Sequence, residues 1–272
     1  MTTEKTVSTA PGQMPDEIVT AEQLADLALE AGVLLLSAGA HSGRVFSNIK
    51  RFADRWGFPI HVHPTFTGLI VTVRDHADPE RTVTRYQDAP PPRVHLLTLT
   101  LFSRLSWRAL DQRLSFAQIK REIETIKAAP GYPPLAVIPA VGMACGCLCM
   151  LFGGDILNGL CAFFAAAIGQ AVRIWMGRQD FNPMLVNVGS AFVATLIAGI
   201  DTFWNIGSSP EATLATSVLF LIPGVPLLNS VIDLIEGYLS ASLARGLFAA
   251  FTVLCIAAGM TVAITLMGID NL

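Results

Sequence analysis

The second half of the chain is dominated by five long apolar segments, at residues 132–152, 156–176, 184–204, 212–235 and 243–267. Each is close to the ~20 residues that an α-helix needs to cross the roughly 30 Å hydrocarbon core of a bilayer. So much continuous apolar sequence is typical of a protein that is solvated by lipid. The pattern predicts an α-helical membrane domain with five transmembrane helices over residues 131–272.

The charged residues are concentrated in the other half. Of the 18 Lys and Arg, 15 precede Pro130, and so do 14 of the 21 Asp and Glu and all five His. The chain as a whole is 14% charged, against about 25% in a soluble domain. Two solvents are therefore indicated, water for the first half and lipid for the second. The net charge of -3 argues against a nucleic-acid partner.

Residues 20–130 are predicted to form a small cytosolic α+β domain. Capping-box patterns begin at Thr20 and Ser115 and mark the starts of two helices. The stretches "PIHVHPTFTGLIVTVRD" and "RTVTRYQD" are rich in Val, Ile and Thr and predict a β-hairpin and a third strand. Residues 1–19 show no basic region followed by an apolar run, so we expect a disordered lead-in and no signal peptide.

Three basic residues set the expected orientation. Arg173, Arg178 and Arg245 are the only Lys or Arg after Pro130, and five spans place them on the same side as the N-terminal domain. The positive-inside rule then predicts a cytoplasmic N-terminus and a C-terminus outside.

The fourth apolar segment interrupts itself at "LIPGVPLLNSVIDLIEGY". Pro223, Gly224 and Pro226 should break the helix near the middle of the span, where freed backbone groups need protein or water partners. A half-helix can restart at Pro226, and its positive N-terminus is suited to a carboxylate. The expected substrate-binding residues are Gly224, Val225, Leu227, Leu228 and Asn229, with Asn187 of the third segment as a secondary candidate.

A polar stripe follows the break. At about 100° per residue, Asn229, Asp233, Glu236 and Ser240 fall within an arc of roughly 60°. Ionisable groups at membrane depth indicate function, so Asp233 and Glu236 are the predicted proton-coupling residues. The alternative is that both acids lie at the headgroups and only mark the helix end. Asp201, near the outer end of the third segment, is expected to be interfacial.

Several further patterns have a simple structural interpretation beside a functional one. His61 and His63 share a strand face and could hold a metal, but an exposed strand face is the simpler interpretation. Ser37, His41 and nearby acids could form a hydrolase site, although no G-x-S-x-G motif is present. The "CGCLC" cysteines are expected to be packing residues. We therefore predict no catalytic residue, no metal ligand and no cofactor.

Gly142 and Gly146 form a G-x-x-x-G pattern in the first apolar segment. The pattern favours close helix packing, and a chance occurrence in a glycine-rich helix is the alternative.

The chain resembles the threonine/serine exporter family. The similar stretches are "LIPGVPLLNSVIDLIEGYLSASLARG", "FGGD", "LLLSAGAHSGRVFSNIKRFADRWG" and "RLSFAQIKREIETIKAAPGYP", so the resemblance extends over nearly the whole chain after the lead-in. It implies export of small amino acids across the bacterial inner membrane. Fused members carry a second membrane half, so this chain resembles the larger subunit of a split exporter that a small membrane protein completes.

The substrate and the class of protein retain alternatives. Some split relatives of the family are associated with dicarboxylate export, especially succinate, beside threonine and serine. No Walker A sequence is present, which favours a secondary, ion-coupled mechanism over ATP drive within this chain. The competing hypotheses are a membrane-anchored hydrolase and a regulatory subunit of a transporter. We expect the protein to form a hetero- or homo-oligomer.

Overall fold

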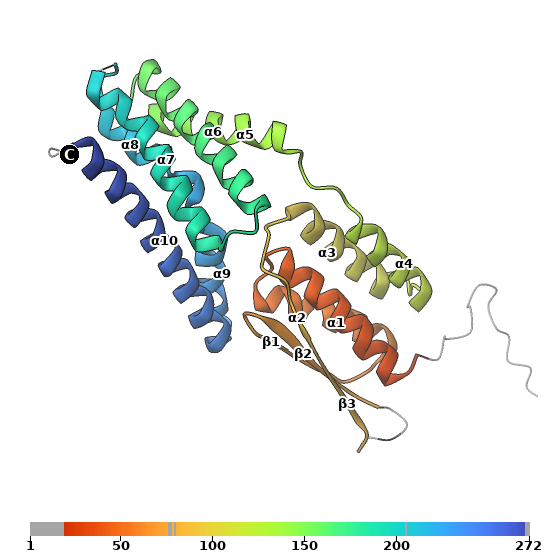
Figure 1. The fold of residues 1–272 in the computed structure, drawn as a ribbon. Coiled ribbons are helices and arrows are strands. Elements are labelled where there is room, and N and C mark those ends of the chain that lie inside the picture. Colours follow the sequence, from red (N-terminus) through yellow and green to blue (C-terminus); the bar gives the residue numbers. More distant parts are fainter. Residues whose placement is uncertain (1–18, 76–77, 79, 205, 270–272) are drawn as a thin grey trace, which may run out of the picture. The chain divides into compact units, whose positions relative to one another are not determined.

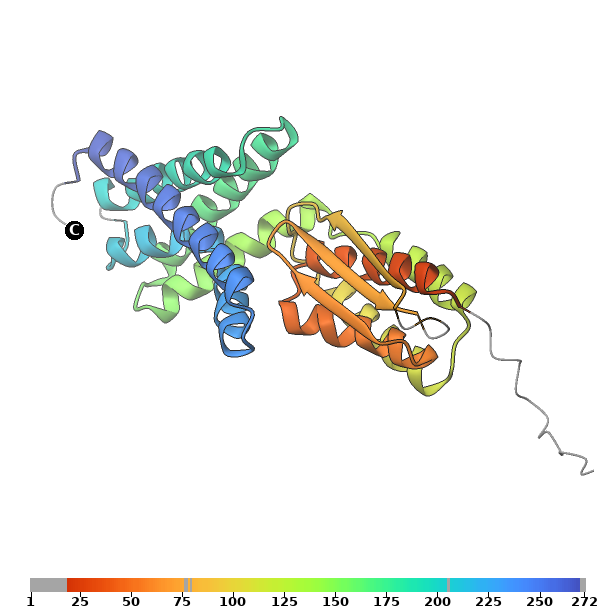
Figure 2. The same ribbon diagram turned by 90° about the horizontal axis from the view of Figure 1, so that it is seen from below.

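The computed structural model describes residues 19–75, 78, 80–204 and 206–269. The described chain divides into two compact units (Figures 1 and 2). The first unit holds the residues up to Ala129 together with Ile232–Ala241, and the second holds Pro130–Val231 and the residues from Ser242 onward. A short segment late in the sequence thus belongs with the N-terminal domain.

The first unit is a three-stranded antiparallel sheet with helices on one face. Strands β1 (Ile60–Pro64), β2 (Gly68–Arg74) and β3 (Thr82–Asp88) lie in that order. Helices α1 (Ala21–Ser37) and α2 (Ser42–Trp56) pack against the strands, as Figure 2 shows from below. Helix α3 (Leu96–Asp111) packs on α2, and α4 (Phe116–Lys127) packs on α3.

The capping and hairpin predictions are confirmed in this unit. The hydroxyls of Thr20 and Ser115 accept hydrogen bonds from the backbone of Gln23 and Gln118, and both boxes close reciprocally. Helix α2 ends at Gly57, which adopts a left-handed φ of 76° that glycine tolerates without strain. The largest fully buried side chains of the domain come from α1, α2, β2, α3 and α4, among them Leu24, Ile49, Phe52, Leu69, Phe102 and Ile119.

The second unit is built from apolar helices. They are α5 (Pro134–Leu151), α6 (Ile156–Arg178), α7 (Pro183–Trp204), α8 (Pro210–Ser217), the short 3-10 helix η1 (Leu219–Leu221), α9 (Gly224–Ile235) and α10 (Leu239–Met267). Four of these helices are long and apolar enough to span a membrane, and α8–η1 with α9 form a bent pair that could make a fifth span. Four or five candidate spans therefore stand where the sequence predicts five.

Helices α5 and α6 approach closely at the G-x-x-x-G pattern. A Cβ added at Gly142 would lie 2.8 Å from the carbonyl oxygen of Phe163, and one added at Gly146 would lie 2.7 Å from that of Gly159. Both distances are below any normal Cβ contact, and the obstructing atoms are backbone. The glycines are thus required by the packing, which confirms the close-packing prediction.

Candidate functional site

The fourth apolar segment is broken at the predicted place. The α8–η1 stretch and α9 meet at a bend of 65°, and Ile222 between them is extended. Helix α9 begins at Gly224, two residues before the predicted restart at Pro226. Pro226 therefore lies in the first helical turn, where its missing N–H removes no intrahelical hydrogen bond.

The start of α9 is open on its outer face. A Cβ at Gly224 would meet no atom within 4 Å, and the side chains of Leu227 and Leu228 are 38% and 65% exposed. Val225 and Asn229 are half-buried. A helix N-terminus of this kind directs backbone N–H groups and a positive dipole end outward, so the predicted substrate-binding role of these residues stays a prediction with a suitable geometry.

Asn187 lies inside the second unit on α7, with only 8% of its surface exposed. The same unit buries two further polar side chains, Gln170 on α6 and Thr195 on α7. Within the described chain, Gln170 Oε1 and Thr195 Oγ1 have no hydrogen-bond partner. Buried polar atoms normally find partners, so water or a transported solute would be favoured near them.

The end of α9 corrects one part of the predicted stripe. Gly237 adopts a left-handed φ of 86°, the Gly237 N–H donates to Leu234 O, and the Tyr238 N–H donates to Asp233 O. This pair of bonds is a Schellman motif, which ends a helix at a glycine. Ser240 consequently lies on α10 and does not continue the stripe of Asn229, Asp233 and Glu236.

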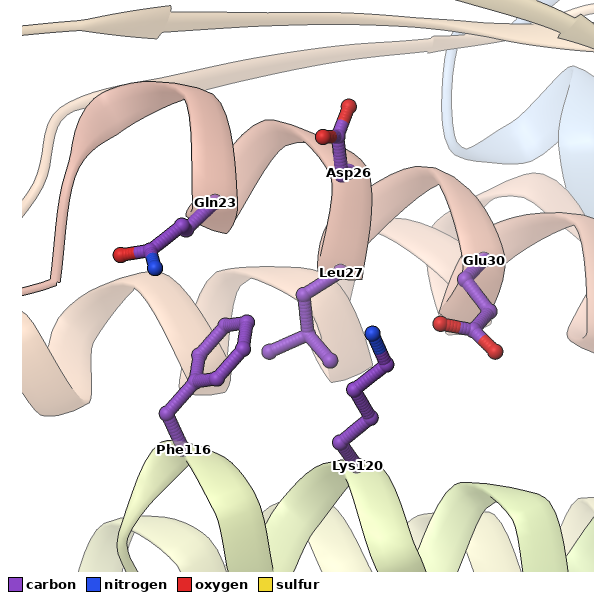
Figure 3. A pocket seen from close by; sticks show the side chains of 6 residues that line it. All are labelled: Gln23, Asp26, Leu27, Glu30, Phe116 and Lys120. Carbon is purple, nitrogen blue, oxygen red and sulfur yellow. The ribbon is translucent and has the colours of Figure 1, made fainter.

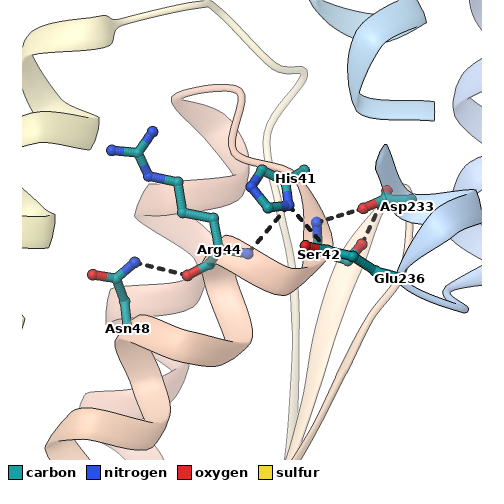
Figure 4. Close-up of polar contacts among 6 residues, drawn as sticks. All are labelled: His41, Ser42, Arg44, Asn48, Asp233 and Glu236. Carbon is teal, nitrogen blue, oxygen red and sulfur yellow. Dashed lines mark hydrogen bonds and ion pairs between the residues drawn. The ribbon is translucent and has the colours of Figure 1, made fainter. Parts of the chain in front are cut away.

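Asp233 is fully buried in the first unit, at the start of α2. Its Oδ1 accepts from the Ser42 backbone N–H at 2.7 Å, and its Oδ2 accepts from the Ser42 hydroxyl at 3.1 Å (Figure 4). Because Ser42 is the first residue of α2, the carboxylate occupies the positive end of a helix dipole, which stabilises a negative charge. Sequence reasoning did not find this pairing, since 191 residues separate the partners.

His41 and Glu236 complete the cluster beside Asp233. His41 Nδ1 lies 3.2 Å from Glu236 Oε2, and the Arg44 backbone N–H points at the same ring nitrogen from 3.3 Å (Figure 4). Gly43 makes the room, because a Cβ there would lie 2.0 Å from Glu236 Oε2. Burial, then the charges of Glu236 and Asp233, raise the pKa of the neighbouring Tyr238 phenol, so Tyr238 stays neutral near pH 7.

The cluster has a composition that can bind a metal. One donor atom from each of His41, Asp233 and Glu236 lies within 4.8 Å of the others. Each oxygen of Asp233 already accepts one hydrogen bond from Ser42, and each has a second lone pair that could face an ion. His61 and His63 are both exposed on β1, as the simpler interpretation of this pair expected. Neither belongs to the group of His41, Asp233 and Glu236 whose donor atoms lie close together in the described chain.

Ser42 is not placed as the nucleophile of a hydrolase. Ser42 has no exposed surface, and its hydroxyl donates to a carboxylate. A nucleophile needs access to a substrate and a base aligned with its hydroxyl. Ser42 offers no such access and therefore acts as a hydrogen-bond donor that holds Asp233.

A second buried polar cluster lies in the second unit around Asp201. The carboxylate of Asp201 is fully buried and accepts from Asn158 Nδ2 at 2.7 Å, Thr213 Oγ1 at 2.6 Å and the Gly207 N–H at 3.0 Å. Three donors therefore enclose Asp201, and its expected position near the membrane interface stays a prediction. Asp155 extends the cluster: backbone N–H groups of Asn158, then Ser208, lower the pKa of its carboxyl.

The N-terminal domain also carries a shallow groove between α1 and α4 (Figure 3). Its volume is about 180 Å³, below the ~300–1,000 Å³ of typical small-molecule pockets. Gln23, Asp26, Glu30 and Lys120 surround Leu27 and Phe116 there, an ordinary helix–helix seam with a charged rim. We assign no ligand to it.

The apolar helices, the broken segment and the buried acids together define a multi-pass membrane protein with the features of a transporter. A family model described as "Putative threonine/serine exporter" matches residues 26–267. The chain belongs to this family, which confirms the resemblance seen in the sequence.

Curated relatives carry two substrate names. The chain is 28% identical to the "Probable succinate transporter subunit YjjP" of Escherichia coli (strain K12), over 89% of this chain and 94% of the relative. It is 26% identical to the "Probable threonine/serine exporter" of Mycobacterium tuberculosis, over 94% of this chain and 48% of the relative. It is 24% identical to the "Threonine/serine exporter" of Corynebacterium glutamicum, over 78% of this chain and 45% of the relative. No solved structure matches the chain.

Proposed function

We propose that the chain is an exporter subunit for small carboxylate-bearing metabolites, driven by a secondary, ion-coupled mechanism. The observation that carries the proposal is the 65° break in the fourth apolar segment, which leaves the N-terminus of α9 inside apolar sequence. Broken helices in transporters use such an N-terminus to bind an anionic group of the substrate. A regulatory subunit would not need the break.

In this mechanism the substrate carboxylate binds at Gly224–Asn229, and Asn187 is the secondary contact. Asp233 and Glu236 take up and release the coupling proton at the other end of the same helix. The support for Asp233 is its complete burial together with its place on the broken helix, since a buried titratable group is a candidate for a functional role.

The substrate class that we favour is a C4-dicarboxylate such as succinate, with threonine or serine as the second candidate. The relatives named for succinate transport are matched over nearly their full length. The threonine/serine exporters are matched over about half of theirs. Threonine and serine export was the first expectation from the sequence, and both substrate types carry the carboxylate that the break would bind.

We further propose five spans, an N-terminal domain in the cytoplasm, residence in the bacterial inner membrane and a small membrane-protein partner. The word "subunit" in the name of the Escherichia coli relative supports a partner. The three basic residues after Pro130 support the orientation.

The deciding experiment reconstitutes the purified chain into liposomes, alone and with the small partner subunit. Transport of labelled succinate, threonine and serine is followed with and without an imposed proton gradient. We expect gradient-dependent transport of succinate only when both proteins are present. Full transport by the single chain would refute the partner requirement, and transport of none of the three compounds by the complex would refute the proposed function.

A further inference from the structure

His41 has one ring nitrogen between two partners that it cannot satisfy together. The Arg44 backbone N–H, 3.3 Å away, can donate only to an Nδ1 that carries a lone pair. The ionised carboxylate of Glu236, 3.2 Å away, can accept only from an Nδ1 that carries a proton. A doubly protonated ring must therefore give up the contact with the Arg44 N–H, whereas a neutral ring with its proton on Nε2 keeps that contact and gives up the one with Glu236.

The surrounding structure keeps the Glu236 carboxylate beside His41 Nδ1. Asp233, three residues earlier, is fixed by the backbone and hydroxyl of Ser42, and the turn at Gly237 ends α9 immediately afterwards. Gly43 supplies the space in which the Glu236 carboxylate lies. The segment that ends the broken helix thus meets the start of α2 through two neighbouring acids, of which Asp233 is buried and Glu236 is exposed.

We propose that His41 and Glu236 form a proton-binding site which couples the start of α2 to the end of the broken helix. When a proton binds Nδ1, the hydrogen bond from the Arg44 N–H breaks and an Nδ1–H···Oε2 ion pair with Glu236 forms. When the proton leaves, Nδ1 again caps α2 and Glu236 is released. His41 is a positioning residue for the acids of the exporter, so the inference rests on the proposed function.

The charged surroundings are consistent with this exchange. Asp233 in the last turn of α9 and Tyr238 in the turn after it face the pair, and burial and the two acids raise the pKa of Tyr238, which keeps it neutral. The Arg44 guanidinium is directed to α3, where it donates to Leu99 O and Ser103 Oγ. Histidine is the side chain whose charge ordinarily changes between about pH 5 and 8.

Helix α3 offers a matched control. His95 caps α3 as His41 caps α2, through Nδ1 and the backbone N–H of Thr98. Its ring nitrogen bonds the Thr98 hydroxyl in place of a carboxylate. His41→Asn and His95→Asn both remove an imidazole ring and keep a good N-cap residue. The two variants differ because, of these two histidines of the described chain, only His41 contacts Glu236.

The experiment uses the full chain with its partner subunit in proteoliposomes and measures export between pH 5.5 and 8. For wild type and His95→Asn we expect a range of pH in which the export rate changes by up to about tenfold per pH unit. In His41→Asn the export rate should change by less than about twofold between pH 5.5 and 8. Gly43→Ala should do the same, because its Cβ displaces Glu236 while every titrating group remains and alanine favours the helix.

A second readout does not depend on transport. In the purified chain, the ring ¹⁵N signal that disappears in His41→Asn should titrate in wild type and move in Glu236→Gln, and it should be unchanged in His95→Asn. A wild-type pH profile in both His41→Asn and Gly43→Ala would overturn the inference. So would export that requires added Mn²⁺ or Zn²⁺ and is lost with a chelator, which would make the cluster a metal site. Absence of transport with a normal His41 titration would instead refute the proposed function and leave the proton site in place.

Discussion

Replacement of Asp233 by asparagine separates the charge of this residue from its shape. Asp233 accepts from the Ser42 N–H through Oδ1 and from the Ser42 hydroxyl through Oδ2. An asparagine can keep the first bond through its carbonyl oxygen. It can also keep a bond to the hydroxyl, because the hydroxyl can rotate to accept from the amide NH₂.

The loss of stability should therefore be small. What disappears is the interaction of a negative charge with the N-terminus of α2, about 0.3–1 kcal/mol at exposed sites and up to ~2 kcal/mol when buried. We expect the free energy of unfolding to fall by about 1–2 kcal/mol, with normal abundance in the membrane. Asp233→Ala should lose more, since a buried Ser42 N–H without its acceptor costs about 1–3 kcal/mol.

Export should fall much further than stability in Asp233→Asn, because an amide cannot take up the coupling proton. We expect at least a tenfold loss of gradient-driven export in proteoliposomes, corresponding to about 1.4 kcal/mol in the transport barrier. The isosteric control is Asp180→Asn in the loop before α7, where the side chain is exposed and the change should be silent. A folded Asp233→Asn protein that exports at the wild-type rate with wild-type pH dependence would refute the coupling role.

Three other outcomes are expected from the structure. Asp201→Asn should lower the melting temperature of the detergent-solubilised protein, because one of the three donors around the carboxylate would then face an amide NH₂ at about 1–3 kcal/mol; an unchanged melting temperature would contradict the buried cluster. Gly146→Ala should destabilise by about 1–3 kcal/mol through a clash with backbone, whereas Gly177→Ala in α6, whose Cβ would meet no atom within 4 Å, should not; equal melting curves for the two variants would contradict the close packing. A reporter enzyme that is active only outside the cytoplasm should be active when it is fused to the C-terminus. Activity of a reporter that works only in the cytoplasm would reverse the proposed orientation.

The features that sequence predicted well are those fixed by neighbouring residues. The capping boxes at Thr20 and Ser115 and the break at Pro223 each depend on chemistry within about one helical turn. The alternation of Val, Ile and Thr likewise located the hairpin of β1 and β2. Ser240 was misplaced because the angular calculation continued a helix through Gly237, although a glycine at that point is itself a stop signal.

The candidate site was only partly accessible to such reasoning. Asp233 and Glu236 were found because acids are rare in apolar segments, but their partners His41 and Ser42 lie in another domain of the sequence. The enclosure of Asp201 was not predicted for the same reason, since its donors Asn158 and Gly207 come from separate loops and helices. Distance along the chain shows how far a residue lies from a helix end, and it does not show which residues enclose it.

The position of Asp233 explains why its charge should be adjustable. It lies in the last turn of α9, where the negative end of the helix dipole disfavours a carboxylate, and also at the first turn of α2, where the positive end favours one. Glu236 lies one turn further on, beside a histidine ring that can donate to it only through a proton on Nδ1. A movement of α9 relative to α2 would change the balance between these two helix ends at Asp233. In the proposed mechanism the substrate carboxylate binds at the first turn of α9, and the acids lie in and just after its last turn. The binding of an anion and the release of a proton would then both act on this one helix.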